Sequence, residues 1–290
     1  MNKQRKAYLY GLTAVILWST VATAFKISLR YLDPIQLLLF SSIASILTLG
    51  FVLVFQRKLK EVFSLSKKQY ALALGLGLLN PVLYYLILFK AYDLLPAQEA
   101  QPINYTWALI LSFLSIPLLK QKISKRDIIS GVMGYFGVYI ISTHGDVFSL
   151  RFSDTTGVVL ALISTVVWAL YWIYNTKSDI DPVIGLLLNF LFGFPFVLLV
   201  CYLFSNFNIN SIHGVLGAVY VGVFEMGIAF VCWLMALKLS VNTAKVGNLI
   251  FISPFLSLVF IHFFVGEKIL SSTFVGLIFI MLGLLTQQAN

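Results

Sequence analysis

Charged residues are scarce in this sequence. Lys, Arg, Asp and Glu make up 11% of its 290 residues, whereas soluble globular domains carry about 25%. Hydrophobic residues make up 60%, and the mean hydropathy is +0.94. The deficit excludes an ordinary soluble domain and predicts an integral membrane protein. In such a protein the net charge of +9 informs about the orientation of loops rather than about nucleic-acid binding, so we expect no nucleic-acid partner.

Cysteine and the sequence signatures of enzymes are also scarce. The two cysteines, Cys201 and Cys232, both lie inside apolar runs, where a disulfide is not expected. The three histidines, His144, His213 and His262, are scattered. No HExxH, no GxSxG and no phosphate-binding loop ending in Gly-Lys-Ser/Thr is present. We therefore predict that the protein is not an enzyme, binds no metal or cofactor and is not driven by ATP.

What the sequence contains instead is a series of long apolar runs. A membrane-spanning helix needs roughly 20 mostly apolar residues. Ten segments qualify, namely 7–29, 34–55, 69–91, 97–119, 127–143, 154–176, 182–204, 215–237, 243–264 and 270–287. The loops between them are short, so any functional site must lie among the helices. The sequence predicts an all-α integral membrane fold of ten transmembrane helices.

The basic residues are distributed unevenly over the two sides of these spans. With the N-terminus inside, fifteen of the twenty Lys and Arg residues fall on the inner side. Because cytoplasmic loops carry the excess of Lys and Arg, both termini are predicted to be cytoplasmic. The basic N-terminal segment, its apolar run and "VATA" (21–24) also fit a cleaved signal peptide. The alternative, an uncleaved first helix, is the one that an internal repeat requires.

The two halves of the chain resemble each other. Four weak matches share an offset of 146 to 150 residues: "LDP" (32–34) with "IDP" (180–182), Trp18 with Trp168, "QKI" (121–123) with "EKI" (267–269), and Gly137 with Gly283. We predict two five-span repeats, at 1–145 and 153–290. Five is an odd number, so the second repeat enters the membrane inverted. Inverted repeats place a substrate site near the midplane and permit alternating access, although duplication also occurs in channels and scaffolds.

Several of these features occur together in a known family. Ten spans in two halves, a basic N-terminus, "LDP" after the first span and "GEK" (266–268) before the tenth resemble the drug/metabolite transporter superfamily, EamA type. The resemblance implies a carrier of metabolites or drugs, often an exporter, in the inner membrane. The fourth span is similar to that of bacterial aromatic amino-acid exporters, whose Asn-Tyr-x-Trp-Pro pattern is matched by Asn104, Tyr105 and Trp107, with Ala108 in place of the proline.

One carboxylate is predicted to lie deep in the membrane. Glu225, in "VGVFEMGIAF" (221–230), is near the middle of the eighth span and has no basic neighbour in sequence. A charge at this depth costs free energy and is a functional candidate by default. Our hypothesis is that Glu225 couples transport to protons or contacts a substrate amine. The alternative is a protonated acid that is hydrogen-bonded inside the bundle.

Two further charges are predicted near the outer ends of their spans. Lys26, on the first span, and Glu99, on the fourth, are close enough in depth to pair as an outer gate. The alternative is that Lys26 extends to the lipid headgroups and that Glu99 is simply hydrated.

The start of the fourth span is unusually polar. At helical spacing Gln98, Gln101 and Tyr105 fall on one face, with Asn104 and Trp107 beside it. Such a face does not suit lipid, and Pro102 frees a backbone carbonyl at the same level, which a cavity or a partner helix can compensate. We predict that this segment lines a central cavity. The alternative is hydrogen bonding between helices.

Aromatic and amide side chains mark other spans. On the sixth span, Trp168, Tyr171, Trp172 and Asn175 share a face, and such a face can stack on a planar ligand or hold a cation. Trp172 and Tyr174 lie near the inner surface, where interfacial aromatic residues are common, so we expect them in that belt. The remaining candidates for substrate binding are Asn80 and Tyr84 on the third span and Asn248 on the ninth.

Together these patterns favour a secondary active transporter that exports small amphipathic molecules. We expect a small-molecule substrate, the lipid bilayer and a proton as coupling ion as its partners, and a monomeric chain. The alternative is a membrane protein that does not transport solutes, such as a lipid scramblase or a scaffold.

The orientation can be tested in the 144–153 loop, which we predict to be external. In a chain whose native cysteines are replaced by serine, Phe148→Cys should react with a membrane-impermeant maleimide added to intact cells. A Lys60→Cys control, in a predicted cytoplasmic loop, should react only after lysis. Protection of position 148 until lysis would contradict the predicted orientation.

Overall fold

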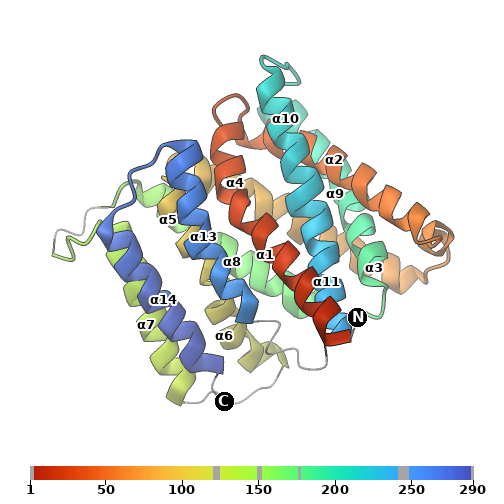
Figure 1. Ribbon diagram of the computed structural model, residues 1–290. Coiled ribbons are helices and arrows are strands. Elements are labelled where there is room, and N and C mark those ends of the chain that lie inside the picture. Colours follow the sequence, from red (N-terminus) through yellow and green to blue (C-terminus); the bar gives the residue numbers. More distant parts are fainter. Residues whose placement is uncertain (1–2, 120–124, 149–151, 176–177, 241–247, 289–290) are drawn as a thin grey trace.

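The computed structural model is a bundle of helices in which both termini lie at the same end (Figure 1). It describes residues 3–119, 125–148, 152–175, 178–240 and 248–288, and within these ranges it contains helices but no strand. Within the described ranges, six helical stretches are long and apolar enough to cross a membrane, judged by length and composition alone. Shorter apolar helices cover Ile128–Ser142, Ile252–Val265 and Ser271–Thr286. The predicted all-helical architecture is therefore confirmed, whereas the count of ten spans stays a prediction.

The helical segments follow the predicted spans closely. In the first half they are α1 (Lys3–Ser28), α2 (Pro34–Phe55), the 3₁₀ turn η1 (Leu59–Phe63), α3 (Lys67–Gly77), the π-helical η2 (Leu78–Leu83), α4 (Tyr84–Leu94), α5 (Ala97–Tyr105), α6 (Trp107–Leu119) and α7 (Lys125–Ser142). In the second half they are α8 (Thr155–Asn175), α9 (Pro182–Phe204), α10 (Ile212–Tyr220), the π-helical η3 (Val221–Ala229), α11 (Phe230–Leu239), the 3₁₀ turn η4 (Asn248–Phe251), α13 (Ile252–Phe260), the π-helical η5 (Ile261–Val265) and α14 (Ser271–Gln288).

Two of the predicted spans are interrupted within the bundle. In the third span, Asn80 has a non-helical backbone (φ −143°, ψ 113°) directly before Pro81. This is expected, because proline disfavours the helical conformation of the residue before it. The fourth span divides at Thr106 into α5 and α6, four residues after Pro102. The free backbone groups at such breaks need partners inside the protein.

The repeated "LDP" and "IDP" tripeptides are helix starts. The Asp33 carboxylate accepts hydrogen bonds from the backbone N–H groups of Ile35 (2.8 Å) and Gln36 (2.9 Å) at the start of α2. The Asp181 carboxylate accepts one from Val183 (3.0 Å) at the start of α9. Each aspartate is followed by proline, which is suited to the first helical position because it has no N–H to satisfy. The motif is thus explained by helix capping.

The same two aspartates also tie α2 to α9. The Ser205 hydroxyl, just after the end of α9, donates to Asp33 over 2.5 Å. The Lys58 ammonium, just after the end of α2, donates to Asp181 over 2.5 Å. This hydrogen bond raises the pKa of Lys58. The two helices are therefore antiparallel neighbours that are joined at both ends.

The neighbours of the remaining helices form a regular pattern. Helix α7 packs along α14, and α2 packs along α9. Helices α4 and α6 of the first half both pack on α8 of the second half. Likewise, helices α11 and α13 of the second half both pack on α1 of the first half. This set of contacts therefore stays the same when each helix is exchanged for its counterpart in the other half.

Glycine allows α7 and α14 to approach closely. A Cβ atom added to Gly137 would lie 2.4 Å from the carbonyl oxygen of Gly276, and one added to Gly276 would lie 2.5 Å from that of Gly137. Both partners are backbone atoms, which cannot move without shifting a helix. Close approach of this kind is the usual role of small residues between membrane helices.

We expect Gly137→Ala to destabilise the protein by about 1–3 kcal/mol, the usual cost of overpacking. The measurement is the thermal unfolding midpoint in detergent. Gly50→Ala, in the interior of α2, is the matched control, because a Cβ atom there meets nothing within 4 Å. Its midpoint should be unchanged or slightly higher, since alanine is the better helix former. Equal midpoints for the two variants would show that the α7–α14 contact is not tight.

Candidate functional site

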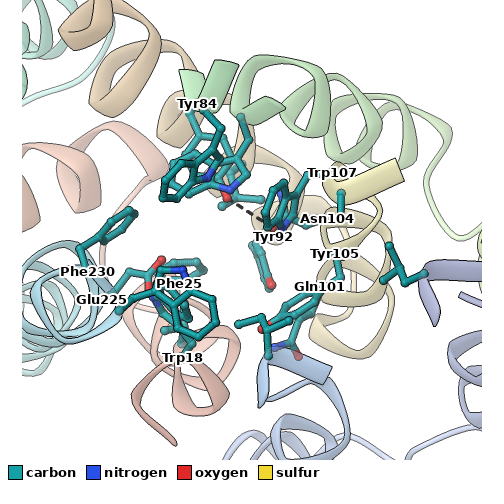
Figure 2. A pocket seen from close by; sticks show the side chains of 18 residues that line it. Trp18, Phe25, Tyr84, Tyr92, Gln101, Asn104, Tyr105, Trp107, Glu225 and Phe230 are labelled. Carbon is teal, nitrogen blue, oxygen red and sulfur yellow. Dashed lines mark hydrogen bonds between the residues drawn. The ribbon is translucent and has the colours of Figure 1, made fainter. Parts of the chain in front are cut away.

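A cavity of about 260 Å³ lies between the two halves of the bundle. Residues of α1, α4, α5, α6, α8, η3, α11, η4 and α14 line it: Trp18, Val21, Phe25, Tyr84, Leu88, Tyr92, Gln101, Asn104, Tyr105, Trp107, Ala108, Trp168, Trp172, Glu225, Phe230, Trp233, Ile250 and Leu284. In Figure 2, Trp18, Glu225 and Phe230 lie on one side of the hollow, and Gln101, Tyr105 and Trp107 lie on the other. The volume is close to the lower end of the range for ligand sites, ~300–1,000 Å³.

All five tryptophans of the chain line this cavity. Trp18 and Trp233 meet with ring centroids 5.3 Å apart, and Trp107 and Trp172 are stacked at 6.4 Å. Tryptophan in membrane proteins is more commonly enriched at the lipid interfaces. The concentration of every indole around one cavity therefore points to a binding surface.

The polar start of the fourth span faces this cavity. The amide of Asn104 donates to Ser164 Oγ (3.0 Å) and its oxygen accepts from the Tyr84 hydroxyl (3.3 Å). The Tyr105 hydroxyl donates to Ser253 Oγ over 2.7 Å. These bonds join α5 to α4, α8 and α13. The same residues thus line the cavity and hold helices together, so the two interpretations offered for this segment both apply.

A stack of aromatic rings forms one wall. Tyr84 and Trp168 are stacked with centroids 4.3 Å apart and planes inclined by 24°. Tyr171 lies on the other side of Trp168, at 5.3 Å and 21°. Tyr171 itself is not among the lining residues, so it supports Trp168 from behind. Its hydroxyl lies 3.3 Å from the side-chain amide of Asn189.

Glu225 is the charged residue of the cavity wall. It lies in η3, and the residue is 9% exposed. Its Oε1 accepts a hydrogen bond from the Tyr85 hydroxyl over 3.3 Å, and its Oε2 has no hydrogen-bond partner in the described part of the chain. A buried ionised carboxylate requires compensation by a cation or a proton. Glu225 can therefore exchange a bound proton for a cationic ligand that enters the cavity.

Most of the candidate residues named from the sequence meet at this cavity. Those that line it are Tyr84, Gln101, Asn104, Tyr105, Trp107, Trp168 and Glu225. Asn80 lies at the break in the third span and Tyr171 lies behind Trp168, so neither lines the cavity. Asn248 begins η4, but its side chain lies outside the part that the structure describes.

Other lining residues were not expected from the sequence. Trp172, for which a position in the interfacial belt was predicted, lines the cavity and is stacked with Trp107 of α6. Trp18, Phe25 and Trp233 were not candidates at all. For Trp18 a signal existed, since it is the repeat counterpart of Trp168.

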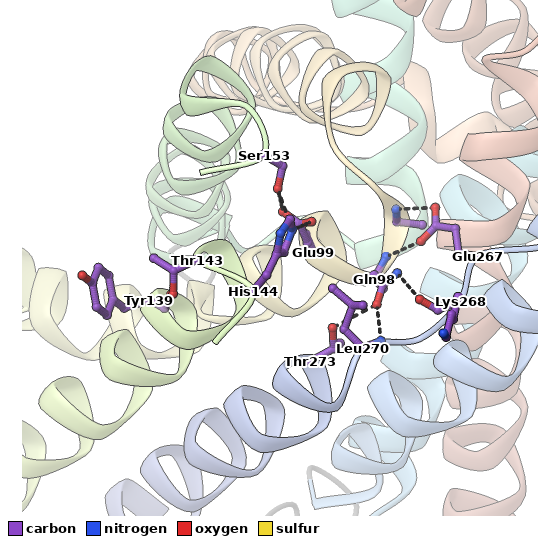
Figure 3. Close-up of polar contacts among 11 residues, drawn as sticks. Gln98, Glu99, Tyr139, Thr143, His144, Ser153, Glu267, Lys268, Leu270 and Thr273 are labelled. Atoms are coloured by element: carbon purple, nitrogen blue, oxygen red, sulfur yellow. Dashed lines mark hydrogen bonds and ion pairs between the residues drawn. The ribbon is translucent and has the colours of Figure 1, made fainter. Parts of the chain in front are cut away.

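The predicted pair of Lys26 and Glu99 does not form. The Lys26 ammonium donates to the backbone oxygens of Tyr92 (2.7 Å) and Leu95 (2.8 Å), which accept it at the end of α4. A cation is favoured at a helix C-terminus, and this explains its choice of partner. Glu99 is 1% exposed and bonds His144 (2.7 Å) and the Ser153 hydroxyl instead (Figure 3).

A set of hydrogen bonds joins the start of α5 to the segment around Glu267–Thr273 at the end of the bundle that lies opposite the termini. The Glu267 carboxylate accepts from the backbone N–H groups of Ala97 (2.8 Å) and Gln98 (3.1 Å) at the start of α5. The Gln98 side chain bonds the backbone of Lys268 (3.0 Å) and Leu270 (2.9 Å) and the hydroxyl of Thr273 (3.0 Å) (Figure 3). We call these six residues the latch. It joins the first half of the chain to the second.

A helical membrane bundle with a cavity lined by both halves is consistent with a small-molecule transporter. The model of the EamA-like transporter family matches residues 5–143 and, a second time, residues 155–286. The chain belongs to this EamA-like transporter family, and it is a multi-pass membrane transporter rather than an enzyme.

Curated relatives agree with this assignment. An uncharacterized transporter of Clostridium kluyveri is 26% identical over 96% of this chain and 92% of its own length. The uncharacterized transporter YvbV of Bacillus subtilis is 27% identical over 97% and 90%. The aromatic amino acid exporter YddG of Ancylobacter novellus is 24% identical over 87% and 86%. A solved crystal structure with 22% identity covers 97% of this chain and 96% of that one with a TM-score of 0.70, so the fold is shared.

Proposed function

We propose that the protein is a monomeric secondary active transporter of the inner membrane, with both termini in the cytoplasm. It exports small amphipathic metabolites, such as amino acids, or drug-like organic molecules, by alternating access. The observation that carries this proposal is the cavity that all five tryptophans line and to which both halves contribute, together with the latch, whose hydrogen bonds join the two halves at the end opposite the termini.

Two observations support ten spans arranged as two inverted repeats. The family model matches the chain twice, once in each half. The helix contacts also stay unchanged when the two halves are exchanged. In transporters of this construction the substrate site lies between the repeats, and one repeat rocks against the other.

The lining runs from Phe25 and Tyr92, near the ends of α1 and α4 opposite the termini, to Trp172 and Leu284, near the ends of α8 and α14 on the side of the termini. Because the latch is formed at the end opposite the termini, we assign this conformation to a state that is closed to the outside and receives a cytoplasmic substrate. Opening the other side requires the latch to break. Its hydrogen bonds can be replaced by bonds to water, and exchanges of this kind have a small net free energy, about 0.5–1.5 kcal/mol per bond.

The lining suits a small substrate with a planar part. The stacked face of Tyr84 and Trp168 provides aromatic surface, and Asn104 and Gln101 provide amides that bond polar groups without adding charge. The relative that is named an aromatic amino acid exporter supports the same size and shape. A sugar phosphate is disfavoured, because anions are usually bound by bidentate Arg or by Lys, and the described lining contains neither.

The test is counterflow of radiolabelled aromatic amino acids and their amines in sealed proteoliposomes. We expect saturable flux, which a scramblase or a scaffold would not give. Trp168→Ala and Tyr105→Ala should each weaken apparent affinity by ~0.5–2 kcal/mol through the loss of one ring contact, or about two- to thirtyfold. Tyr202→Ala is the control, since Tyr202 is 73% exposed on α9 and does not line the cavity. Unchanged affinity in both cavity variants would move the site elsewhere.

We further propose that Glu225 couples export to protons. It faces the cavity, and one of its oxygens lacks a partner within the described residues, so protonation and substrate binding compete for the same group. In proteoliposomes with a fixed substrate concentration, wild-type flux should depend on pH and on an imposed pH gradient. Glu225→Gln keeps the shape of the side chain and should remove both dependences. A Glu225→Gln variant with the wild-type pH profile would assign Glu225 a structural role.

A further inference from the structure

Two buried hydrogen-bond acceptors on residues that line the cavity have no partner among the described residues. They are Oε2 of Glu225 and Oε1 of Gln101. The two residues are 9% and 3% exposed, and both line the cavity. Figure 2 shows them on opposite sides of the same hollow. Buried acceptors without a donor are uncommon in folded proteins, so a ligand that donates hydrogen bonds would satisfy them.

The rings around these acceptors are suited to a positive charge. Trp18, Phe230 and Trp233 form one cluster, with Trp18 5.8 Å from Phe230 and 5.3 Å from Trp233. Trp168 adjoins Phe230 at 5.7 Å. Aromatic faces attract ammonium groups through the ring quadrupole, and tryptophan does so most strongly.

The described lining of the cavity contains no cationic side chain that could bind an anion. Among its described lining residues there is no Lys, Arg or His. Lys26, the nearest candidate along α1, already donates to the backbone oxygens of Tyr92 and Leu95. One buried donor of the lining, the neutral Nε1–H of Trp172, has no partner within the described residues, and it suits a hydroxyl or carbonyl oxygen.

We propose that the substrate is an organic monocation whose ammonium group is bound by Glu225 and Gln101 within the tryptophan cluster. This inference rests on the transport function proposed above and specifies its substrate class. It distinguishes amines from amino acids. The Glu225 carboxylate can balance the single positive charge of an amine. A zwitterion would bring a carboxylate of its own, for which the described lining provides no cationic side chain. An amine with one aromatic ring matches both the charge and the rings of the cavity.

The experiment is a binding series in which the ring is kept and the charge is changed. The probes are 2-phenylethylamine (cation), 2-phenylethanol (neutral), phenylalanine (zwitterion) and 3-phenylpropionate (anion), titrated at neutral pH against the purified protein. Intrinsic fluorescence is the readout, because all five tryptophans line the cavity. We expect the amine to bind about ten- to a hundredfold more tightly than the alcohol, the gain usual for a hydrogen bond to a charged group, and the acid to bind most weakly.

Two variants and one control assign the preference to residues. Glu225→Gln should lower the affinity for the amine to that for the alcohol and leave the alcohol unchanged, which also shows that the variant is folded. Gln101→Leu should weaken amine binding less than Glu225→Gln does. Glu61→Gln removes a carboxylate from the exposed turn η1 and should leave the whole series unchanged.

The outcomes distinguish this inference from the transport proposal. If phenylalanine or 3-phenylpropionate binds wild-type protein as tightly as the amine, or if the preference for the amine persists in Glu225→Gln, the ammonium site is refuted even where flux is saturable. If the amine binds with the expected dependence on Glu225 but shows no saturable flux in proteoliposomes, the ammonium site is supported and the transport function is contradicted.

Discussion

A polar group inside a membrane helix has no water to bond, and the structure is organised by the need to give each such group a partner. At the helix ends this need is met by side chains of the same protein. Asp33 and Asp181 cap α2 and α9, and each also accepts a hydrogen bond from a residue beyond the end of the other helix, Asp33 from Ser205 and Asp181 from Lys58. Lys26 bonds the free carbonyls at the end of α4, and Glu267 bonds the free N–H groups at the start of α5. Helix ends are therefore places where charged side chains join neighbouring helices, while the helix bodies meet through apolar side chains, through glycine and through hydrogen bonds such as that between Tyr105 and Ser253.

The interior breaks follow from the same requirement. The fourth span divides next to the cavity, at Thr106, and the eighth passes through π-helical η3, which carries Glu225. A continuous helix satisfies its own backbone and presents only side chains to a ligand, whereas a broken one exposes polar backbone and side-chain groups at mid-depth. Such groups are tolerated only where protein or a cavity surrounds them. The irregular segments and the cavity thus depend on each other, and neither would be stable against lipid.

The all-helical architecture and several residues of the cavity lining could be predicted from the sequence, because the free-energy cost of a polar side chain in the membrane singles out individual residues. Glu225, Gln101 and Asn104 are conspicuous in an apolar run, and each of them lines the cavity. Trp18 and Trp233 are not conspicuous, since an indole is acceptable in lipid, at the interface or in a core, and only the packing of α1 against α11 brings the two together. The pairing of Lys26 with Glu99 was wrong for a related reason. The depth of a residue along a helix can be estimated from sequence, but its contacts depend on how the helix is rotated and on where neighbouring helices end. Lys26 donates to backbone carbonyls at the C-terminus of α4, and Glu99 bonds His144.

The distribution of contact types indicates which parts of the bundle can move. Helices α7 and α14 meet through Gly137 and Gly276 at distances that leave no room for a methyl group, and contacts of this kind are lost steeply when helices separate. The latch, in contrast, consists of hydrogen bonds at the end of the bundle, and water can replace each of them at little net cost. In the alternating access proposed above, a motion that opens the end opposite the termini would meet least resistance at the start of α5 and in the segment that precedes α14, and α7 and α14 would move together. Since α5 carries Gln101, Asn104 and Tyr105 into the cavity, release of the latch would also displace these three residues, and in the proposed mechanism it would link opening of the gate to release of the ligand.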